Sequence, residues 1–222
     1  LFFQHTQIEF VIANAVDLTS ASTTALFANN GTLNISLPST STVARVSAYM
    51  SHRGKINILQ GNLTVSGGSD SWAPITIAAA GAINFAGVAT HTINVGANVV
   101  SSGTMYYTGG NVYYQYVGHP TPPLARVPVL IFPLSLFFLQ NRYSQLENAG
   151  LAVVSAPLNI GIGTSITRLG SQVLVSGASA QLNLFGSADS LTLSKLSVAG
   201  GTLTLAGTVQ VTDSFSQTGG TI

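Results

Sequence analysis

The sequence predicts an all-β chain wound as a right-handed parallel β-helix, with a β-sandwich as the alternative. Three observations lead to this prediction. A glycine-led strand of five residues recurs along the chain, short alternating strands separated by Gly and Ser lie between its copies, and no stretch shows the 3.6-residue periodicity of a helix. A chain of 222 residues with this single pattern is expected to form one solenoid domain over residues 1–222.

The recurring unit consists of Gly or Ala, any residue, an aliphatic residue, a polar residue and a further apolar residue. Its copies are GTLNI at Gly31, GKINI at Gly54, GAINF at Gly81, GTMYY at Gly103, AQLNL at Ala180 and GTLTL at Gly201. In an extended strand the two apolar side chains of the unit face one way and the polar side chain faces the other. Each copy therefore predicts a strand with one buried face.

The copies recur at intervals that fit the turns of a solenoid. The first four lie 23, 27 and 22 residues apart, and the last copies, counting GTI at Gly220, lie 21 and 19 apart. Runs such as NLTV (62–65) and TVQV (208–211) supply second and third strands in each turn. The variable interval argues against a coil of fixed hexapeptide period, and parallel crossovers are right-handed in nearly all cases. A sandwich fits the strand spacing but does not require the repeated pattern.

The two ends of the chain look incomplete as solenoid ends. GTI at Gly220 begins another copy of the unit, and solenoids need polar caps at their ends. The opening LFFQHTQIEF has no basic region and no small-residue cleavage site of a secretory signal. We therefore expect a fragment of a longer array, with uncapped ends.

Residues 117–140 differ from the rest of the chain. They hold five of the eight prolines and a 13-residue apolar run from Val127 to Leu139. A membrane span needs about 17–25 apolar residues, so a span is disfavoured. A proline-rich surface loop is a second interpretation. We favour a third, a translated intron, because Phe, Leu, Ser and Pro have pyrimidine-rich codons and the 24 codons keep the frame. Either way, the segment is predicted to be an irregular insertion outside the coil.

The composition excludes several classes of partner and chemistry. Charged residues form 6% of the chain, with seven basic and six acidic side chains that form no runs, so nucleic acid is not an expected partner. There is no Cys, which excludes disulfides and thiolate sites. The sequons at Asn30, Asn34 and Asn62 are candidate N-glycosylation sites and favour an extracellular or cell-surface location.

The acidic residues do not form a catalytic pair. Asp189 and Asp213 come closest, but aligning the strands that start at Leu191 and Val209 separates them by roughly 20 Å at about 3.3 Å per residue. Carboxylates that act together in glycosidases lie about 5–9.5 Å apart. The other acids, Glu9, Asp17, Asp70 and Glu147, are isolated in the sequence. The sequence thus predicts no catalytic residues.

The histidines and serines likewise predict no site. His5, His52, His91 and His119 share no metal-binding spacing, and no Ser stands in a nucleophile-elbow motif. No metal and no cofactor are therefore expected. The chain is interpreted as not being an enzyme.

Two sets of outward side chains remain as candidates for binding. Asn34, Asn57, Asn84 and Asn183 occupy the same polar place in their units, and Asn57 and Asn84 are expected on adjacent turns, hydrogen-bonded along the stack. By alternation, Tyr107 and Tyr114 face inward and Tyr106 and Tyr113 outward. Exposed aromatic rings can stack on sugars, so Tyr106 and Tyr113 are candidate carbohydrate contacts.

The stretches GTLTL (201–205), SQTGGTI (216–222) and LENAGLAVV (146–154), in a low-charge Gly/Ser/Thr/Asn background, resemble adhesin-like parallel β-helix proteins. These include autotransporter passengers, filamentous haemagglutinin-type repeats and large secreted eukaryotic β-helix proteins, and the wider pectin-lyase-like architecture. The resemblance covers most of the chain except 117–140. It implies a non-catalytic structural or adhesive role at the cell surface or in the matrix, with carbohydrate or protein partners. The alternative is a polysaccharide lyase or glycoside hydrolase whose acids lie outside this segment.

Overall fold

The computed structural model describes residues 9–19, 25–115, 145–160, 165–184, 191–205 and 208–222. These residues form an all-β parallel solenoid of about seven turns, as the sequence predicts. Every strand pair is parallel, which excludes the alternative of an antiparallel sandwich. No helix that could span a membrane occurs in this described part of the chain.

The larger sheet has fourteen strands and forms two of the faces of the coil. One face is built on β1 (Glu9–Ile12), β4 (Thr32–Ser36), β11 (Asn98–Ser101), β14 (Gln145–Asn148) and β17 (Ser165–Arg168). The other is built on β2 (Val16–Leu18), β5 (Val43–Val46), β12 (Thr104–Tyr107), β15 (Leu151–Val154) and β18 (Gln172–Val175). Four long strands contribute to the sheet as well: β7 (Lys55–Val65), β9 (Ile75–Phe85), β20 (Leu191–Val198) and β22 (Val209–Gln217).

The long strands join the two faces because they pair with a different neighbour at each end. The first part of β7 pairs with β4 and its last part pairs with β5, with a shift of register between Ile35 and Ser36 of β4. Leu59 at this bend is exposed, as expected where the strand turns a corner. A single strand can therefore cover two sides of a turn.

The smaller sheet has eight strands and forms the remaining side of the coil. Its strands are β3 (Leu26–Asn29), β6 (Tyr49–His52), β8 (Ser69–Ser71), β10 (Thr90–Ile93), β13 (Asn111–Tyr114), β16 (Pro157–Ile160), β19 (Gln181–Leu184) and β21 (Thr202–Leu205). They stack in chain order from β3 to β21. We call the outward side of this sheet the third face.

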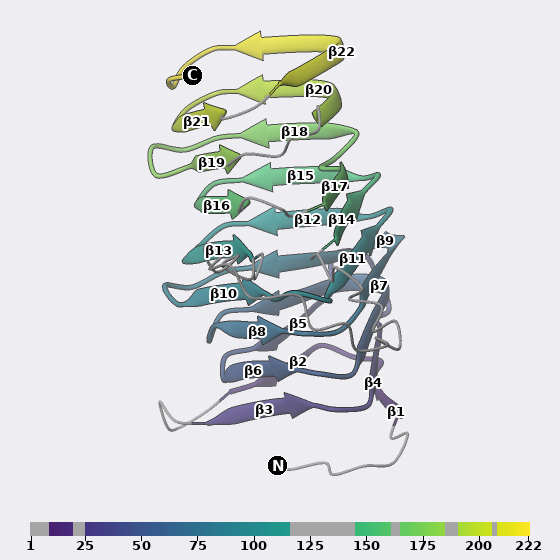
Figure 1. Ribbon diagram of the computed structural model, residues 1–222. Helices are drawn as coiled ribbons and strands as arrows, with labels where there is room; N and C mark the ends of the chain where they lie inside the picture. Colours follow the sequence, from purple (N-terminus) through teal and green to yellow (C-terminus); the bar gives the residue numbers. More distant parts are fainter. Residues whose placement is uncertain (1–8, 20–24, 116–144, 161–164, 185–190, 206–207) are drawn as a thin grey trace, which may run out of the picture.

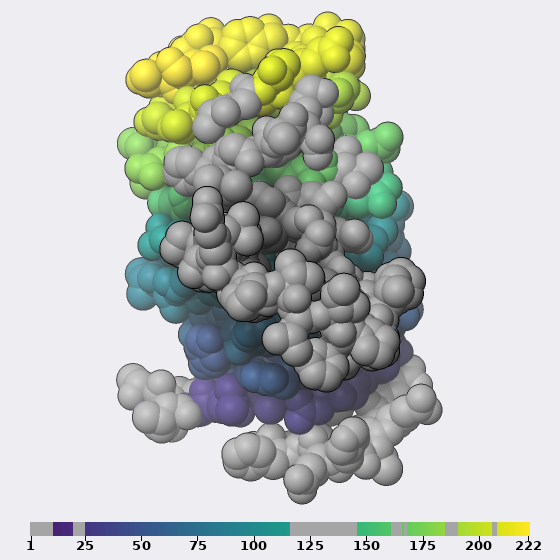
Figure 2. All heavy atoms as spheres, in the orientation of Figure 1, coloured from purple at the N-terminus to yellow at the C-terminus, as the bar shows by residue number. Residues whose placement is uncertain are grey.

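The coil is right-handed. In Figure 1 the strands of the third face run to the right, the strands behind them run to the left, and the chain rises from the N-terminus to the C-terminus. Figure 2 shows the same rise as bands of sequence order stacked along the axis. Each turn therefore contacts the turns before and after it.

The core is a set of columns of aliphatic side chains that run along the axis. In one column Leu33, Ile56 and Ile75 occupy equivalent places on successive turns and are all at least 99% buried. Full burial of a Leu or Ile side chain contributes about 1.5–3 kcal/mol relative to leaving it exposed. The alternation of the repeated unit thus places its apolar residues inside, as predicted.

The copies of the glycine-led unit do not form one continuous column, which corrects part of the sequence interpretation. GTLNI stacks on GKINI, GAINF on GTMYY and AQLNL on GTLTL, but the three pairs lie on three different faces. GKINI stacks on ITI (75–77), whereas GAINF stacks on the NLTV run (62–65) of the turn before it. The 27-residue interval between Gly54 and Gly81 is therefore not one turn.

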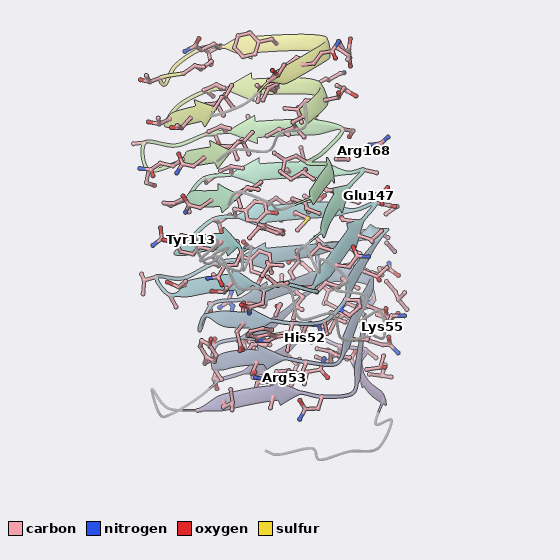
Figure 3. All side chains as sticks on the ribbon, in the orientation of Figure 1. His52, Arg53, Lys55, Tyr113, Glu147 and Arg168 are labelled. Carbon is pink, nitrogen blue, oxygen red and sulfur yellow. The ribbon has the colours of Figure 1, made fainter. Side chains whose placement is uncertain are left out.

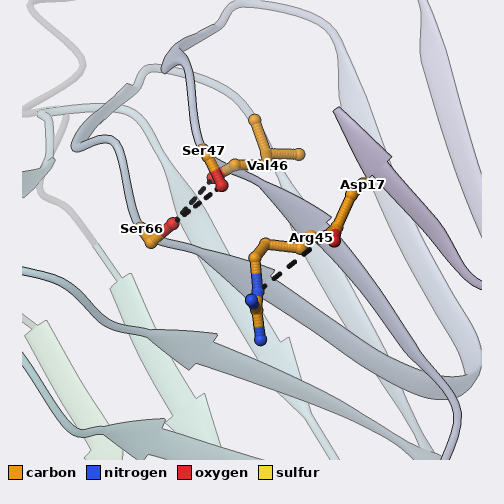
Figure 4. A network of polar contacts seen from close by, with 5 residues as sticks. All are labelled: Asp17, Arg45, Val46, Ser47 and Ser66. Atoms are coloured by element: carbon orange, nitrogen blue, oxygen red, sulfur yellow. Dashed lines mark hydrogen bonds and ion pairs between the residues drawn. The ribbon is translucent and has the colours of Figure 1, made fainter. Parts of the chain in front are cut away.

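Outward neighbours on successive turns pair through their side chains as well. Asp17 on β2 and Arg45 on β5 are register partners, and their carboxylate and guanidinium lie 3.9 Å apart (Figure 4). At the next corner the Ser66 hydroxyl donates to the Val46 carbonyl at 3.5 Å and to Ser47 at 3.3 Å. Both contacts are at least partly exposed to solvent, so each adds little to the stability of the fold. They nevertheless join side chains on successive turns.

Residues 117–140, predicted to lie outside the coil, fall outside the described residues. The register on either side of them is described, however. On one side, Met105 pairs with Ile83, which lies 22 residues earlier. On the other side, Ala152 pairs with Val173, which lies 21 residues later. Met105 and Ala152 also pair with each other, but they are 47 residues apart. Removing the 24 residues 117–140 from that interval leaves 23. The neighbouring turns therefore stack at ordinary register on both sides of the extra length.

Deleting 117–140 should leave the coil folded. The shortened turn would have the length of its neighbours, and no described strand would be lost. Far-ultraviolet circular dichroism and the thermal midpoint of the deletion variant, compared with the full chain, check this. Loss of the β signal would show that the coil depends on the segment.

Gly54 should not tolerate a side chain. A Cβ at Gly54 would meet backbone atoms of the preceding turn, with Asn30 C and Gly31 N both 2.7 Å away, because the two turns pass closely at this corner. Gly54→Ala is expected to cost about 1–3 kcal/mol of unfolding free energy. Gly200→Ala is the matched control, since its nearest backbone contact would be 3.2 Å. Urea unfolding of the two variants checks the difference, and equal loss would contradict the close approach.

Candidate ligand-binding surface

The third face carries exposed aromatic residues among mostly polar outward side chains, and Leu26 on β3 is a further exposed apolar residue of this face. Tyr113 on β13 points outward and is 37% exposed, as predicted, while its neighbour Tyr114 is buried. Its register partners on the adjacent turns are Thr92 and Asn159. Figure 3 shows Tyr113 at a higher turn of the same sheet that carries Arg53. The predicted contact residue therefore belongs to a larger face.

Tyr106 also points outward but lies on a different face. It is half-buried on β12, between Asn84 on β9 and Val153 on β15. The inward partner Tyr107 is buried and its hydroxyl lies 3.1 Å from that of Tyr114. The prediction of which tyrosines face in and out is confirmed, but Tyr106 and Tyr113 do not form one site.

Trp72 is the functional candidate that the sequence analysis missed. It follows β8, is 44% exposed, and its indole Nε1–H donates a hydrogen bond of 3.0 Å to Asp70 Oδ2. The guanidinium carbon of Arg53, on the turn before, lies 5.6 Å from the centre of the indole ring. The sequence could have indicated Trp72 through the alternation Ser69, Asp70, Ser71, Trp72, because this alternation places both serines inside and both larger residues outside.

Tyr49 on β6 extends the aromatic surface on the turn below Trp72. It is 43% exposed, and its ring lies over the corner at Gly68, where a Cβ would be 3.3 Å from Tyr49 Cδ2. Burial, and next the charge of Asp70, raise the pKa of the Tyr49 hydroxyl, so the hydroxyl stays protonated. We call Tyr49, Arg53, Asp70 and Trp72 the Trp72 patch.

The acids with described side chains lie on separate turns or faces. Asp17 faces Arg45 on β5, Lys195 Nζ lies 3.5 Å from Asp213 Oδ2, and Glu147 on β14 is the register partner of Arg168 on β17. Figure 3 shows Glu147 and Arg168 on neighbouring strands, on higher turns than Arg53 of the Trp72 patch. The register of Leu191 on Val209, which we used to separate Asp189 from Asp213, is confirmed. Asp189 itself lies outside the described residues.

The predicted asparagine ladder is confirmed in part. Asn57 Nδ2 donates to Asn34 Oδ1 at 2.7 Å between successive turns, and Asn183 Nδ2 donates to Asn159 Oδ1 at 2.8 Å. The predicted neighbourhood of Asn57 and Asn84 is wrong. Asn57 stacks on Thr76 and Asn84 stacks on Thr64, because β7 and β9 bend between the two positions and place them on different faces.

The three sequons occupy different environments. Asn30 is exposed in the turn before β4, whereas Asn34 lies within β4 and accepts the hydrogen bond from Asn57. Asn62 lies within β7, where its Oδ1 is enclosed without a hydrogen-bond partner and Thr64 of its sequon is buried. Of the three, Asn30 is the one with an exposed side chain.

Two histidines lie inside the coil. His52 and His91 are fully buried, and among the described residues no group of His, Asp and Glu is arranged to hold a metal ion. Figure 3 shows His52 on the interior side of its strand. His5 and His119 lie outside the described residues. The two buried rings are therefore parts of the core.

Hydrogen bonds fix the tautomers of both rings. Asn29 Nδ2 lies 3.0 Å from His52 Nδ1 and also donates to the Lys55 carbonyl, so Nδ1 accepts and Nε2 carries the proton that faces the Pro74 carbonyl at 3.3 Å. His91 Nε2 likewise donates to the Ala86 carbonyl at 3.0 Å, leaving Nδ1 to accept from Ser69. Protonation of His52 at Nδ1 would place an N–H donor opposite the N–H donor of Asn29 Nδ2, so their hydrogen bond would be lost.

Both imidazoles are held neutral by burial. Desolvation lowers the pKa of His52 to about 4, against the opposing effects of the Pro74 carbonyl and the Asp70 charge. Desolvation lowers the pKa of His91 as well, with the Ala86 carbonyl acting in the opposite direction. The Ser69 hydroxyl beside His91 can turn to accept a hydrogen bond from a protonated ring, whereas the Asn29 Nδ2 group that faces His52 can only donate.

The stability of the coil should fall as the pH is lowered from 6.5 toward 4. In this window the unfolded chain binds a proton at His52 that the folded chain does not, because the folded-state pKa is depressed to about 4. At about 1.4 kcal/mol per pKa unit, the loss from His52 alone approaches roughly 3 kcal/mol. Urea unfolding across this pH range checks it. His52→Gln should flatten the dependence, and an unchanged slope would contradict the assignment.

Comparison with known proteins adds no family to this geometry: no family model, curated protein or solved structure matches the chain.

Proposed function

We propose that this chain is a non-catalytic structural or adhesive β-solenoid of the cell surface or extracellular matrix. The observation that carries the proposal is the surface of the coil. Its outward side chains form neutral polar ladders along the axis, such as Asn34 with Asn57 and Asn159 with Asn183. Such a surface is flat, long and rigid, and suits contact along its length better than enclosure of a small substrate.

The placement of the acids supports a non-catalytic role over the alternative of a polysaccharide-cleaving enzyme. Asp17 and Asp213 face basic partners on neighbouring turns, and Asp70 accepts the Trp72 hydrogen bond. Cleavage of a glycosidic bond by the usual route needs two carboxyl groups about 5–9.5 Å apart. Asp17, Asp70 and Asp213 therefore lie in separate contacts on separate turns.

The surface chemistry supports the proposed location. With charged residues at 6% of the chain, hydration rests on Asn, Ser and Thr side chains, and Asn30 presents an open glycosylation sequon. The adhesin-like, pectin-lyase-like character of the repeats belongs to the same proposal. Its expected partners are surface or matrix carbohydrate or protein.

Two measurements on the same preparation test the proposal. Antibody against the chain should label intact, unpermeabilised source cells or their matrix, and the chain should release no reducing ends or unsaturated sugars from pectate, pectin or β-linked glucans. Labelling that requires permeabilisation would contradict the location. Cleavage that is lost in Asp70→Asn or Asp213→Asn, but kept in Asp17→Asn, would overturn the non-catalytic role.

A further inference from the structure

We propose that the Trp72 patch binds a neutral, extended glycan chain along the third face. This inference rests on the proposed adhesive role and names its ligand class and site. Trp72 is the one tryptophan of the chain, and nearly half of its surface is exposed directly after β8, whose inward residues Ser69 and Ser71 are buried. An exposed indole that is held in place offers a rigid apolar plane to the C–H face of a sugar ring.

The indole is held by contacts on two sides. Its Nε1–H donates to Asp70 at 3.0 Å, and the guanidinium of Arg53 lies 5.6 Å from the ring centre. Fixing the ring before binding removes the entropy cost of ordering it when the ligand arrives. The Arg53 guanidinium beside the ring can donate to sugar hydroxyls, whereas Asp70 serves to hold the indole, because its Oδ2 accepts from Trp72 and its Oδ1 is enclosed.

The charges of the patch favour a neutral ligand. Arg53 and Asp70 carry opposite charges on adjacent turns and cancel, so the patch presents no net field to an acidic polysaccharide or to a phosphate. The register partners above Asp70 on the outer side are Thr92 and then Tyr113, which are uncharged. A neutral polyhydroxyl chain matches this mixture of aromatic and hydrogen-bonding groups.

The third face repeats these features along the axis. Tyr49 lies one strand before Trp72 but opposite Gly68, four residues from Trp72 and so about 13 Å across the face at 3.3 Å per residue. Tyr113 lies in the column of Asp70, two strands after it and about 10 Å along the axis at 4.8 Å per strand. The hydroxyls of Thr90 and Thr92 lie on the strand between Trp72 and Tyr113. Several rings of one extended glycan could therefore meet successive turns. A protein partner would need an apolar centre free of such polar interruption.

Intrinsic fluorescence tests the proposal directly, because Trp72 is the single tryptophan. The full chain is titrated with three neutral hexasaccharides, of β-1,4-linked glucose, N-acetylglucosamine and mannose, and with hexagalacturonate as the acidic comparison. Saturable change in the emission with at least one neutral probe is expected, and it should be the same at low and high salt because the ligand carries no charge. No change with any neutral probe, or change with hexagalacturonate alone, would overturn the proposal.

Variants locate the contact. By affinity electrophoresis in the polysaccharide of the bound probe, Trp72→Ala should weaken binding about tenfold, and Trp72→Phe less, because the ring stays but its hydrogen bond to Asp70 is lost. Tyr113→Ala should weaken binding about threefold. Tyr106→Ala, an outward tyrosine on another face, is the matched control and should leave binding unchanged. Equal effects of Tyr106→Ala and Trp72→Ala would overturn the site. Circular dichroism confirms that each variant is folded.

The outcomes separate this proposal from the function on which it rests. Surface labelling without binding of any neutral glycan would leave the adhesive role standing and overturn the glycan site. Binding followed by release of reducing ends would keep the site and overturn the non-catalytic role.

Discussion

The structure depends on one constraint: each turn of the chain is stable only while its apolar side chains lie on those of the next turn. Columns such as Leu33, Ile56 and Ile75 fill the interior, and parallel backbone ladders fix their height. The same stacking brings the corners of successive turns close together, so that the backbone at Gly54 lies directly against the backbone at Gly31. The outward ladders of Asn and the Asp17–Arg45 pair also repeat with the turn.

The interior is not uniformly apolar, and five of its buried polar residues cluster on the inward side of the smaller sheet, in its N-terminal half. Asn29, His52 and Ser71 share one column, with Ser69 and His91 in the next. Directed hydrogen bonds among them fix the two imidazoles and the Asn29 amide in single arrangements. Such contacts specify one register among several that aliphatic columns alone would permit, and they make this part of the coil sensitive to acid. The Trp72 patch lies on the outside of the same turns.

Much of the architecture is readable from the sequence because alternation and repetition directly encode stacking. The inward and outward tyrosines and the Leu191–Val209 register follow from that rule. The faces could not be assigned from the sequence, because Leu59 in β7 and the alanines at 78–80 in β9 are apolar residues that hide the bends, so Asn57 and Asn84 looked equivalent although they are not. Trp72 was missed since its importance comes from Arg53 on another turn, a contact that only the register reveals.

Disulfide trapping across the longest turn tests the stacking most directly, because the chain has no cysteine of its own. Tyr106 and Val153 are outward register partners on β12 and β15, although 47 residues separate them. Tyr106→Cys combined with Val153→Cys should oxidise to an intramolecular disulfide, since adjacent parallel strands lie about 4.8 Å apart. Tyr106→Cys combined with Ala152→Cys should stay reduced, because Ala152 faces the core. Oxidation of the second pair in place of the first would contradict the parallel register.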